Sequence, residues 1–164
     1  MLFTFEYTHS IDDKFRLAIP AEYRHQWDET RDGKAWFCVP WPAPMSSRTG
    51  HLRLYTESTF QKMSSASPAV MFPDEVEADR EASYFGFAIR LTMDKQGRIT
   101  IPEKHLRLAG LGRDVVIVGA GNRLEVRDRV EWAASEEERF KRLPQRVASP
   151  SASSAVQPQA PRGT

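Results

Sequence analysis

Alternating hydrophobic and polar positions predict short strands near the start of the chain and again near its middle. The alternating apolar residues are Phe3, Phe5, Tyr7 and Ile11 in the first segment, and Phe85, Phe87, Ile89, Leu91 and Met93 in the second. A period of two is typical of a strand with one buried face. In both places a polar turn follows, and a second short strand then runs to residue 19 or 101. We therefore expect the same strand–turn–strand unit twice.

The two segments also match residue by residue. When residues 3–20 are laid over residues 85–102, six of eighteen positions are identical, whereas chance expects about one. The identical pairs are Phe3/Phe85, Phe5/Phe87, Asp12/Asp94, Arg16/Arg98, Ile19/Ile101 and Pro20/Pro102. The chain therefore contains an internal duplication.

The similarity continues through the rest of each copy. Proline favours the first position of a helix, so Pro20 and Pro102 predict helices over 21–26 and 103–109. Two further strands follow in each copy, over 36–39 and 52–55 in the first and over 114–118 and 124–127 in the second. Each copy then ends at the start of a helix. The acidic segment 73–85 between the copies is predicted to be helical as well.

These elements predict a mainly β protein with short flanking helices, of the α+β class. Because the first strand pair of each copy is too small to be stable alone, we expect the copies to pack together about a pseudo-twofold axis. The predicted boundaries are 1–80 for the first half, with its loop insertion at 40–50 and a linker, and 81–142 for the second. Residues 143–164 are rich in Pro, Ser, Ala and Gln, which predicts a disordered tail.

Composition narrows the classes of function. The single cysteine, Cys38, excludes an intramolecular disulfide and favours a cytoplasmic protein. We find neither a signal-peptide pattern nor an apolar run long enough to cross a bilayer. The histidines and Cys38 lack metal-ligand spacing, and no arrangement typical of catalysis is present. We therefore expect no enzyme activity, no cofactor, no metal, no small-molecule substrate and no membrane partner.

Two arginines are the candidate functional residues. In each copy the inward-facing neighbours force Arg16 or Arg98 to point outward beside the turn, with Lys14 and Lys95 close in sequence and Arg90 as a further cation. Arginine binds phosphate and guanine well. The residues by themselves leave two roles open: contact with nucleic acid, or a solvated position paired with an acidic side chain. The net charge of +1 does not decide between them.

The same motifs resemble a known family. The segment MDKQGRITIPEKHLRLAGLGRDVVIVGAGNRLEVRDRVEW is similar to the second half of MraZ proteins, and IDDKFRLAIPAEYR resembles their first-half motif. The resemblance implies two tandem AbrB-like swapped-hairpin halves that form a pseudo-twofold barrel. It also implies a cytoplasmic, nucleoid-associated regulator that forms a ring-like homo-oligomer. Such a regulator binds short direct repeats in double-stranded promoter DNA and represses the division and cell-wall gene cluster.

Carried over to this sequence, the resemblance places the DNA-contacting arginines at Arg16 and Arg98. Lys14 occupies the lysine position of the first motif, and Lys95 partly substitutes for it in the second, where Gln96 stands. One departure is Phe15, where the family pattern has glycine. A positive φ at this site would strain a phenylalanine, so either the turn differs or Phe15 makes an apolar contact with a base or a partner.

Two other functions stay open at this point. A different AbrB-like regulator or an antitoxin-like repressor would share the turn motif, although those proteins usually have one copy per chain. A ring-forming interaction scaffold without DNA binding would explain both Phe15 and the near-neutral charge.

Overall fold

The structure is a computed structural model, and it describes residues 1–45, 47–66 and 74–143. Apart from Leu143, the predicted disordered tail lies outside the described residues. The chain divides into two compact units, Met1–Ala133 and Ala134–Thr164. Strands of both sequence copies lie in the first unit.

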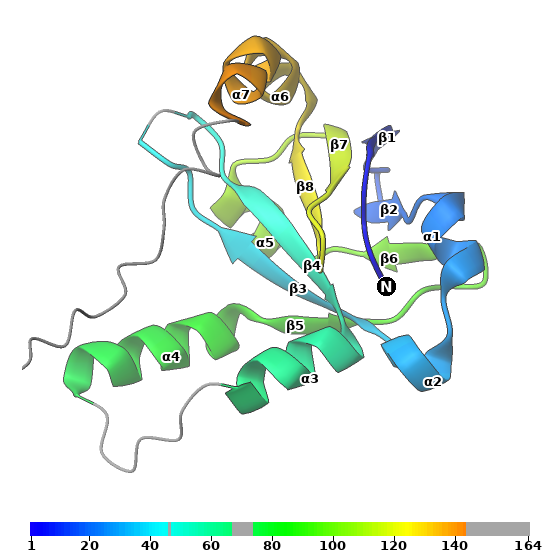
Figure 1. Ribbon diagram of the computed structural model, residues 1–164, viewed down its shortest axis with the longest axis vertical. Coiled ribbons are helices and arrows are strands. Elements are labelled where there is room, and N and C mark those ends of the chain that lie inside the picture. The colour runs from blue at the N-terminus through cyan, green and yellow to red at the C-terminus, as the bar shows by residue number, and fades with distance from the viewer. Residues whose placement is uncertain (46, 67–73, 144–164) are drawn as a thin grey trace, which may run out of the picture. The chain divides into compact units, whose positions relative to one another are not determined.

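Pairs of consecutive strands alternate with one or two helices along the described chain (Figure 1). The strands are β1 (Glu6–Ser10), β2 (Arg16–Ala18), β3 (Trp36–Trp41), β4 (His51–Thr56), β5 (Ile89–Leu91), β6 (Arg98–Thr100), β7 (Asp114–Gly119) and β8 (Leu124–Asp128). The helices are α1 (Ala21–Gln26), α2 (Glu29–Asp32), α3 (Glu57–Ala66), α4 (Glu75–Phe87), α5 (Glu103–Ala109), α6 (Arg129–Ala134) and α7 (Glu136–Arg142). The structure confirms the helices predicted at 21–26 and 103–109 and the four strands predicted after them.

Strand pairing interleaves the two copies. The larger sheet is antiparallel, with the order β1-β7-β8-β4-β3-β5, and β2 pairs with β6 in a separate two-stranded sheet. Strands β1 to β4 belong to the first copy and β5 to β8 to the second. When each strand is exchanged for its counterpart in the other copy, the same order results, read from the opposite edge of the sheet. Equivalent strands of the two copies therefore have equivalent pairing partners.

The register shows the same exchange. His9 of β1 lies opposite Val115 of β7, and Leu91, the counterpart of His9, lies opposite Trp36 of β3. The first strand of each copy therefore pairs with the third strand of the other copy. Because β1 and β2 do not pair with each other, neither copy forms a sheet of its own from its first two strands.

The expected barrel is wrong, because the larger sheet is open. Its edge strands, β1 and β5, each pair with one neighbour and not with each other. After each edge strand the chain turns into β2 or β6, and these two strands pair together instead of closing the larger sheet. The structure thus shows a mixed α+β protein dominated by antiparallel sheet.

Two predicted strands are shorter than expected. Phe85 and Phe87 lie in α4, which extends the predicted acidic helix to residue 87, so β5 begins only at Ile89. Phe3 and Phe5 precede β1, and Phe5 has a φ of 67°. Alternation in the sequence did not identify the helix: Phe85 and Phe87 have the spacing of a strand face, but they lie at the end of α4 and are exposed.

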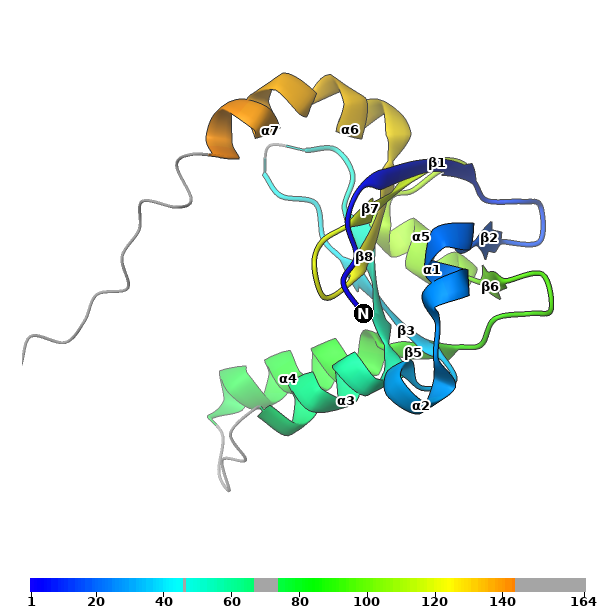
Figure 2. The same ribbon diagram turned by 45° about the vertical axis from the view of Figure 1, so that its right-hand side comes forward.

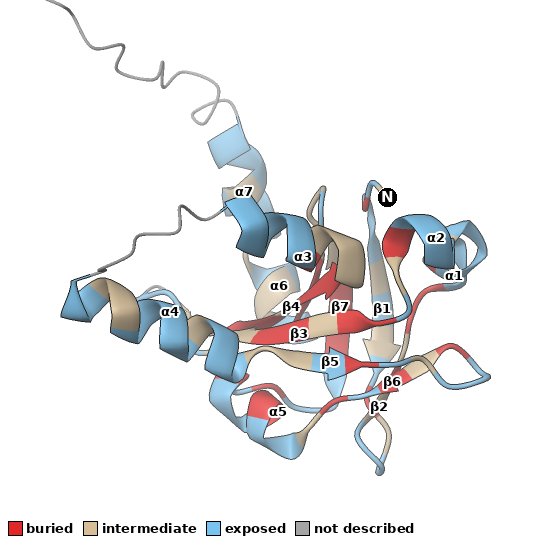
Figure 3. Cartoon of the chain, turned by 90° about the horizontal axis from the view of Figure 1, so that it is seen from below, coloured by how far each residue is buried: buried red, intermediate tan, exposed pale blue. Residues whose placement is uncertain are grey.

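The larger of two buried clusters lies between the larger sheet and the β2–β6 pair. Residues of both copies are fully buried there, among them Leu17, Ile19, Ile99, Ile101 and Trp36. On the other face of the larger sheet, Val39 and Tyr55 pack with Phe60 of α3. Figure 3 shows buried positions on β3 and β7, whereas α3 and α4 are mostly exposed. The β2–β6 pair therefore packs through its buried side chains on the strands of the larger sheet.

The second unit contains α7, which is described by itself. Its first turn holds the exposed Glu136, Glu137 and Glu138. Glu137 pairs with Lys141 at 3.5 Å and Glu138 with Arg142 at 3.0 Å, both at the favourable i,i+4 spacing. Among the helices of the described residues, none has the length and apolar character to span a membrane.

Candidate functional site

Residues 12–16, here called turn one, form a tight turn held by one aspartate. Asp12 Oδ1 accepts hydrogen bonds from the backbone N–H groups of Lys14 and Arg16, both at 2.9 Å. The Phe15 N–H donates to the Asp12 carbonyl, also at 2.9 Å. An aspartate that bonds the backbone ahead of it is a common basis for a turn, and here it fixes the start of β2.

Residues 94–98, here called turn two, repeat this geometry. Asp94 Oδ1 accepts from the N–H groups of Gln96 and Arg98 at 2.8 and 3.0 Å, and the Gly97 N–H donates to the Asp94 carbonyl at 2.9 Å. Gly97 has a φ of 74° and Phe15 a φ of 58°. Turn one therefore has the same left-handed position as turn two, although a phenylalanine occupies it. The alternative of a different geometry for turn one is wrong.

Pairing of β2 with β6 brings the two turns together. Arg16 lies opposite Thr100, and Arg98 lies opposite Ala18. The middle residues of the two strands, Leu17 and Ile99, are fully buried. Because side chains alternate along a strand, both arginines point to the face away from the core. Diagonal neighbours in such a ladder are about 7–8 Å apart. Figure 2 shows both turns projecting on the same side of the ribbon.

Each arginine is also paired with the aspartate of its own turn. Arg16 places Nε and Nη2 at 2.7 Å from Asp12 Oδ2, and Arg98 places the same atoms at 2.8 Å from Asp94 Oδ2. The two arginine side chains keep 30% and 25% of their surface exposed. A guanidinium has five N–H donors, so this pairing orients it and leaves donors for another acceptor.

The ion pairs shift the pKa values of both aspartates and of Arg16. The hydrogen bond from the Arg16 side chain is the main cause that lowers the pKa of Asp12 to about 2, and Arg98 lowers the pKa of Asp94 in the same way. The pKa of Arg16 is raised chiefly by Asp12 and, to a smaller degree, by the charge of Asp94. The effect of Asp94 on Arg16 places the two turns within electrostatic reach of each other.

The other predicted cations divide into two groups. Lys14 and Lys95 are exposed within the two turns. Arg90 lies on β5, where its Nε donates to Glu57 Oε1 of α3 at 2.8 Å. The structure therefore places Lys14, Arg16, Lys95 and Arg98 in the paired turns, whereas Arg90 is held by α3.

A second charged cluster was not predicted from the sequence. Glu125 of β8 is buried, and its carboxylate oxygens lie 2.7 Å from Arg123 Nη2 and 2.6 Å from Arg127 Nη2. Arg53 and His51 of β4 approach the same carboxylate at 3.9 and 3.8 Å. The alternation Arg-x-Glu-x-Arg over residues 123–127 is a visible signal, but the contributions of β4 depend on the register of β4 with β8.

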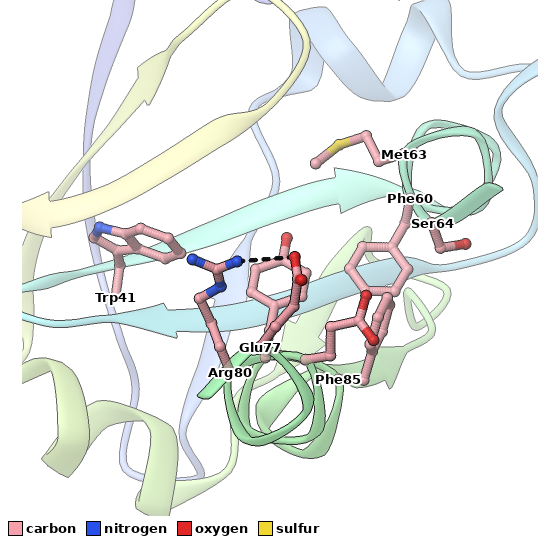
Figure 4. Close-up of a pocket in the computed structure, with 9 residues that line it drawn as sticks. Trp41, Phe60, Met63, Ser64, Glu77, Arg80 and Phe85 are labelled. Carbon is pink, nitrogen blue, oxygen red and sulfur yellow. Dashed lines mark hydrogen bonds and ion pairs between the residues drawn. The ribbon is translucent and has the colours of Figure 1, made fainter. Parts of the chain in front are cut away.

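An apolar groove lies between α3 and α4. It encloses about 300 Å³ and is lined mainly by aromatic and apolar side chains, with Arg80 and Glu77 paired at 3.3 Å beside it. Figure 4 shows Phe60 and Met63 on α3 facing this space, with Phe85 on α4 and Trp41 at its side. Sequence patterning identified neither helix as part of a groove, because the contact between them depends on tertiary packing.

Neither a reactive thiol nor a metal-binding cluster is found in the described part of the chain. Cys38 is buried in β3, and burial raises the pKa of its thiol to about 12, so the reactive thiolate is suppressed. Within residues 1–45, 47–66 and 74–143, no three His, Cys, Asp or Glu side chains gather to hold a metal ion.

Comparison with known proteins identifies the family. The family model described as "MraZ protein, putative antitoxin-like" matches residues 84–148. A protein named "Transcriptional regulator MraZ" from Thioalkalivibrio sulfidiphilus (strain HL-EbGR7) is 32% identical over 132 residues, which cover 80% of this chain and 83% of that one. Its namesake from Thermobifida fusca (strain YX) is 31% identical over 145 residues, covering 85% and 94%. The similarity extends over both copies of the duplicated unit, and the chain therefore belongs to the MraZ family of transcriptional regulators.

Proposed function

We propose that this chain is a sequence-specific DNA-binding repressor in which turn one and turn two contact the DNA. The observation that supports this most directly is the matched pair of arginines, Arg16 and Arg98, on one face of the β2–β6 sheet. An arginine that reaches guanine O6 and N7 in the major groove adds about 1–3 kcal/mol of discrimination. Lys14 and Lys95 add phosphate contacts beside them.

The aspartates support this proposal by orienting the arginines. A free arginine side chain loses rotamer entropy when it binds, and an arginine already held by Asp12 or Asp94 loses less. A preorganised side chain therefore binds with less ordering at the moment of contact. The guanidinium retains N–H donors for a base edge or a phosphate.

A ring of several copies compensates for the low net charge of +1. One protomer with two arginine turns has a modest affinity for a polyanion. Several protomers joined in a ring and bound to evenly spaced direct repeats gain affinity through effective concentration. The proposed partner is double-stranded promoter DNA of the division and cell-wall genes, and the proposed location is the cytoplasm at the nucleoid. The swapped-hairpin description of the two halves is part of this proposal.

Replacement of Arg98 by alanine tests the assignment. We expect Arg98→Ala to weaken binding to the DNA upstream of the protein's own gene by about tenfold or more. The melting temperature should hardly change, because a surface ion pair is worth only about 0–1 kcal/mol. Fluorescence anisotropy measures the affinity, and thermal unfolding followed by circular dichroism measures the melting temperature.

Arg80→Ala is the matched control, since it also removes an arginine paired with a nearby carboxylate on the surface of the same unit. It should leave DNA binding as in the wild type. If Arg98→Ala instead unfolds the protein, or binds DNA as well as Arg80→Ala does, the arginine has a structural role and the proposal fails.

A scaffold without DNA binding is the second candidate. It is favoured by the ion pairs themselves, because both arginines already have a carboxylate partner. A salt-dependent footprint upstream of the protein's own gene separates the two functions, since a scaffold would leave no footprint at any salt concentration. A footprint only elsewhere in the genome would mean that this MraZ-family chain regulates other genes.

A further inference from the structure

The two turns share a backbone geometry but differ in sequence at Asp13/Lys95, Lys14/Gln96 and Phe15/Gly97, the last being the residue just before the arginine. Their hydrogen bonds match, and both have a left-handed position just before the arginine, with φ 58° at Phe15 and 74° at Gly97. Glycine adopts this conformation without steric cost, whereas a phenylalanine is strained there. Strain of this kind is retained where the surrounding structure imposes it, and it concentrates at functional sites.

The surroundings of the two positions differ as well. At Gly97 the Arg24 side chain fills the space, since a Cβ added to Gly97 would lie 2.1 Å from Arg24 Cδ. Arg24 is held there by a 2.9 Å hydrogen bond from its Nε to the Ile19 carbonyl. A side chain at the left-handed position of turn two would therefore have to displace Arg24.

Turn one has an open, partly apolar notch at the same place. The residue that corresponds to Arg24 in the second copy is Leu106, which is shorter and uncharged. A notch of about 260 Å³ lies here, lined on one side by apolar side chains (Ile11, Phe15, Leu106 and Leu111) and otherwise mainly by charged ones (Asp12, Glu103, Arg107 and Arg113). Phe15, which directly precedes Arg16 in the sequence, still exposes 38% of its surface.

We infer that Phe15 is a specificity-determining residue that contacts the 5-methyl group of a thymine next to the base pair contacted by Arg16. This inference rests on the proposed function. The thymine methyl is the apolar group that base pairs present in the major groove, and phenylalanine is among the side chains that meet it. The exposed part of its ring lies next to Arg16, where a thymine methyl group would cover it.

The difference between the turns also gives the protomer a direction on DNA. A reader with two equivalent turns would bind a site equally well in either orientation. With Phe15 in turn one and Gly97 in turn two, only one orientation places the phenylalanine against a thymine. Direct repeats, which all run the same way, suit a reader with such polarity.

Removal of the methyl group from the DNA tests the contact. The probe is the duplex upstream of the protein's own gene, with each thymine in turn replaced by deoxyuridine, which lacks only the 5-methyl group. Burial of one methyl group corresponds to about a fourfold change in affinity. We expect the wild type to lose about fourfold at one thymine per repeat, and Phe15→Gly to bind the thymine and deoxyuridine duplexes equally.

Phe5→Gly is the matched control. Phe5 is the other non-glycine residue with a positive φ in the described part of the chain, and it is also exposed, but it lies before β1 and away from the turn. This variant should keep the wild-type sensitivity to deoxyuridine. Arg98→Ala should bind both duplexes more weakly and keep the fourfold ratio. Thermal unfolding checks that each variant is folded.

The outcomes separate the inference from the proposed function. If the wild type binds neither duplex, the proposed function fails and this inference fails with it. If the wild type binds DNA but no deoxyuridine substitution weakens it, or if Phe15→Gly keeps the fourfold loss, only the inference is overturned. A change in oligomer size on sedimentation of Phe15→Gly, with the methyl effect intact, would assign Phe15 to a contact between copies instead.

Discussion

His51 shows how burial determines the state of a single side chain. It is 4% exposed and lies beside Glu125, with Arg53 and Arg127 close by. Burial is the main cause that lowers the pKa of His51 from 6.5 to about 4, and the charge of Arg127 lowers it further. At neutral pH the imidazole is therefore uncharged, and Glu125 is balanced by arginines alone.

The stability of the protein should depend on pH because of this residue. The unfolded chain binds a proton at His51 below pH 6.5, whereas the folded protein binds it only near pH 4. Stabilisation is thus complete above pH 6.5 and is lost as the pH falls towards 4, by up to about 3 kcal/mol. Urea unfolding at pH 7 and pH 4.5 measures this loss.

His51→Gln should reduce the pH dependence, while the exposed His25→Gln serves as the control and should keep it. Equal pH dependence in His51→Gln and the wild type would mean that another group is responsible.

At the scale of elements, each turn packs against a helix that belongs to the other copy of the duplicated unit. The side chain of Arg24 on α1 covers Gly97 of turn two, and Leu106 on α5 borders Phe15 of turn one. Each turn therefore packs against the helix that follows the other turn. This exchange is the same as the exchange of strands in the larger sheet, and it links the geometry of the two candidate sites.

Gly97→Ala should disturb turn two. The added methyl group would occupy a left-handed position and would collide with the Arg24 side chain, 2.1 Å away. We expect the free energy of unfolding to fall by about 1–2 kcal/mol. Chemical unfolding in urea measures this value.

The control for this prediction is Gly86→Ala in α4, where an added Cβ meets no atom within 4 Å. Alanine is the better helix former, so this variant should be neutral or more stable by up to about 1 kcal/mol. A loss of stability equal to that of Gly97→Ala would contradict the special role of turn two.

At the scale of the whole molecule, interleaving makes the two copies depend on each other. β1 of the first copy pairs with β7 of the second, and β5 of the second copy pairs with β3 of the first. The core is likewise shared, since Leu17 and Ile99 are both fully buried in it. Each turn is thus held by a core that both copies build, and the face with the paired turns exists only when both are folded.

The proposed ring makes a prediction about affinity at the same scale. A duplex that contains all the direct repeats upstream of the gene should bind at least about tenfold more tightly than a duplex with one repeat, because bound protomers raise the effective concentration of their neighbours. A gel shift with the two duplexes at one salt concentration measures the ratio. Equal affinity for both would contradict a multivalent reader.

Local features of the sequence predicted much of the candidate site. The spacing Asp-x-x-x-Arg predicts a turn with an adjacent arginine, because the aspartate bonds backbone groups only two and four residues ahead. Pro20 and Pro102 predict the starts of α1 and α5 for the same local reason. The duplication predicts that both copies contain these features. The roles of Lys14, Arg16, Lys95 and Arg98 in DNA contact stay predictions.

Only the tertiary structure decided which strands pair and which side chains share a cluster. Alternation shows that a strand has a buried face, but it has no information about the partner strand. The pairing of β1 with β7 and the open sheet therefore had no signal in the sequence. Of the cluster around Glu125, only the Arg-x-Glu-x-Arg alternation was visible, and not the contribution of β4. The sequence by itself determined the turns and short helices, whose bonds are local. The tertiary structure decided where they meet, because that depends on contacts between residues far apart in the chain.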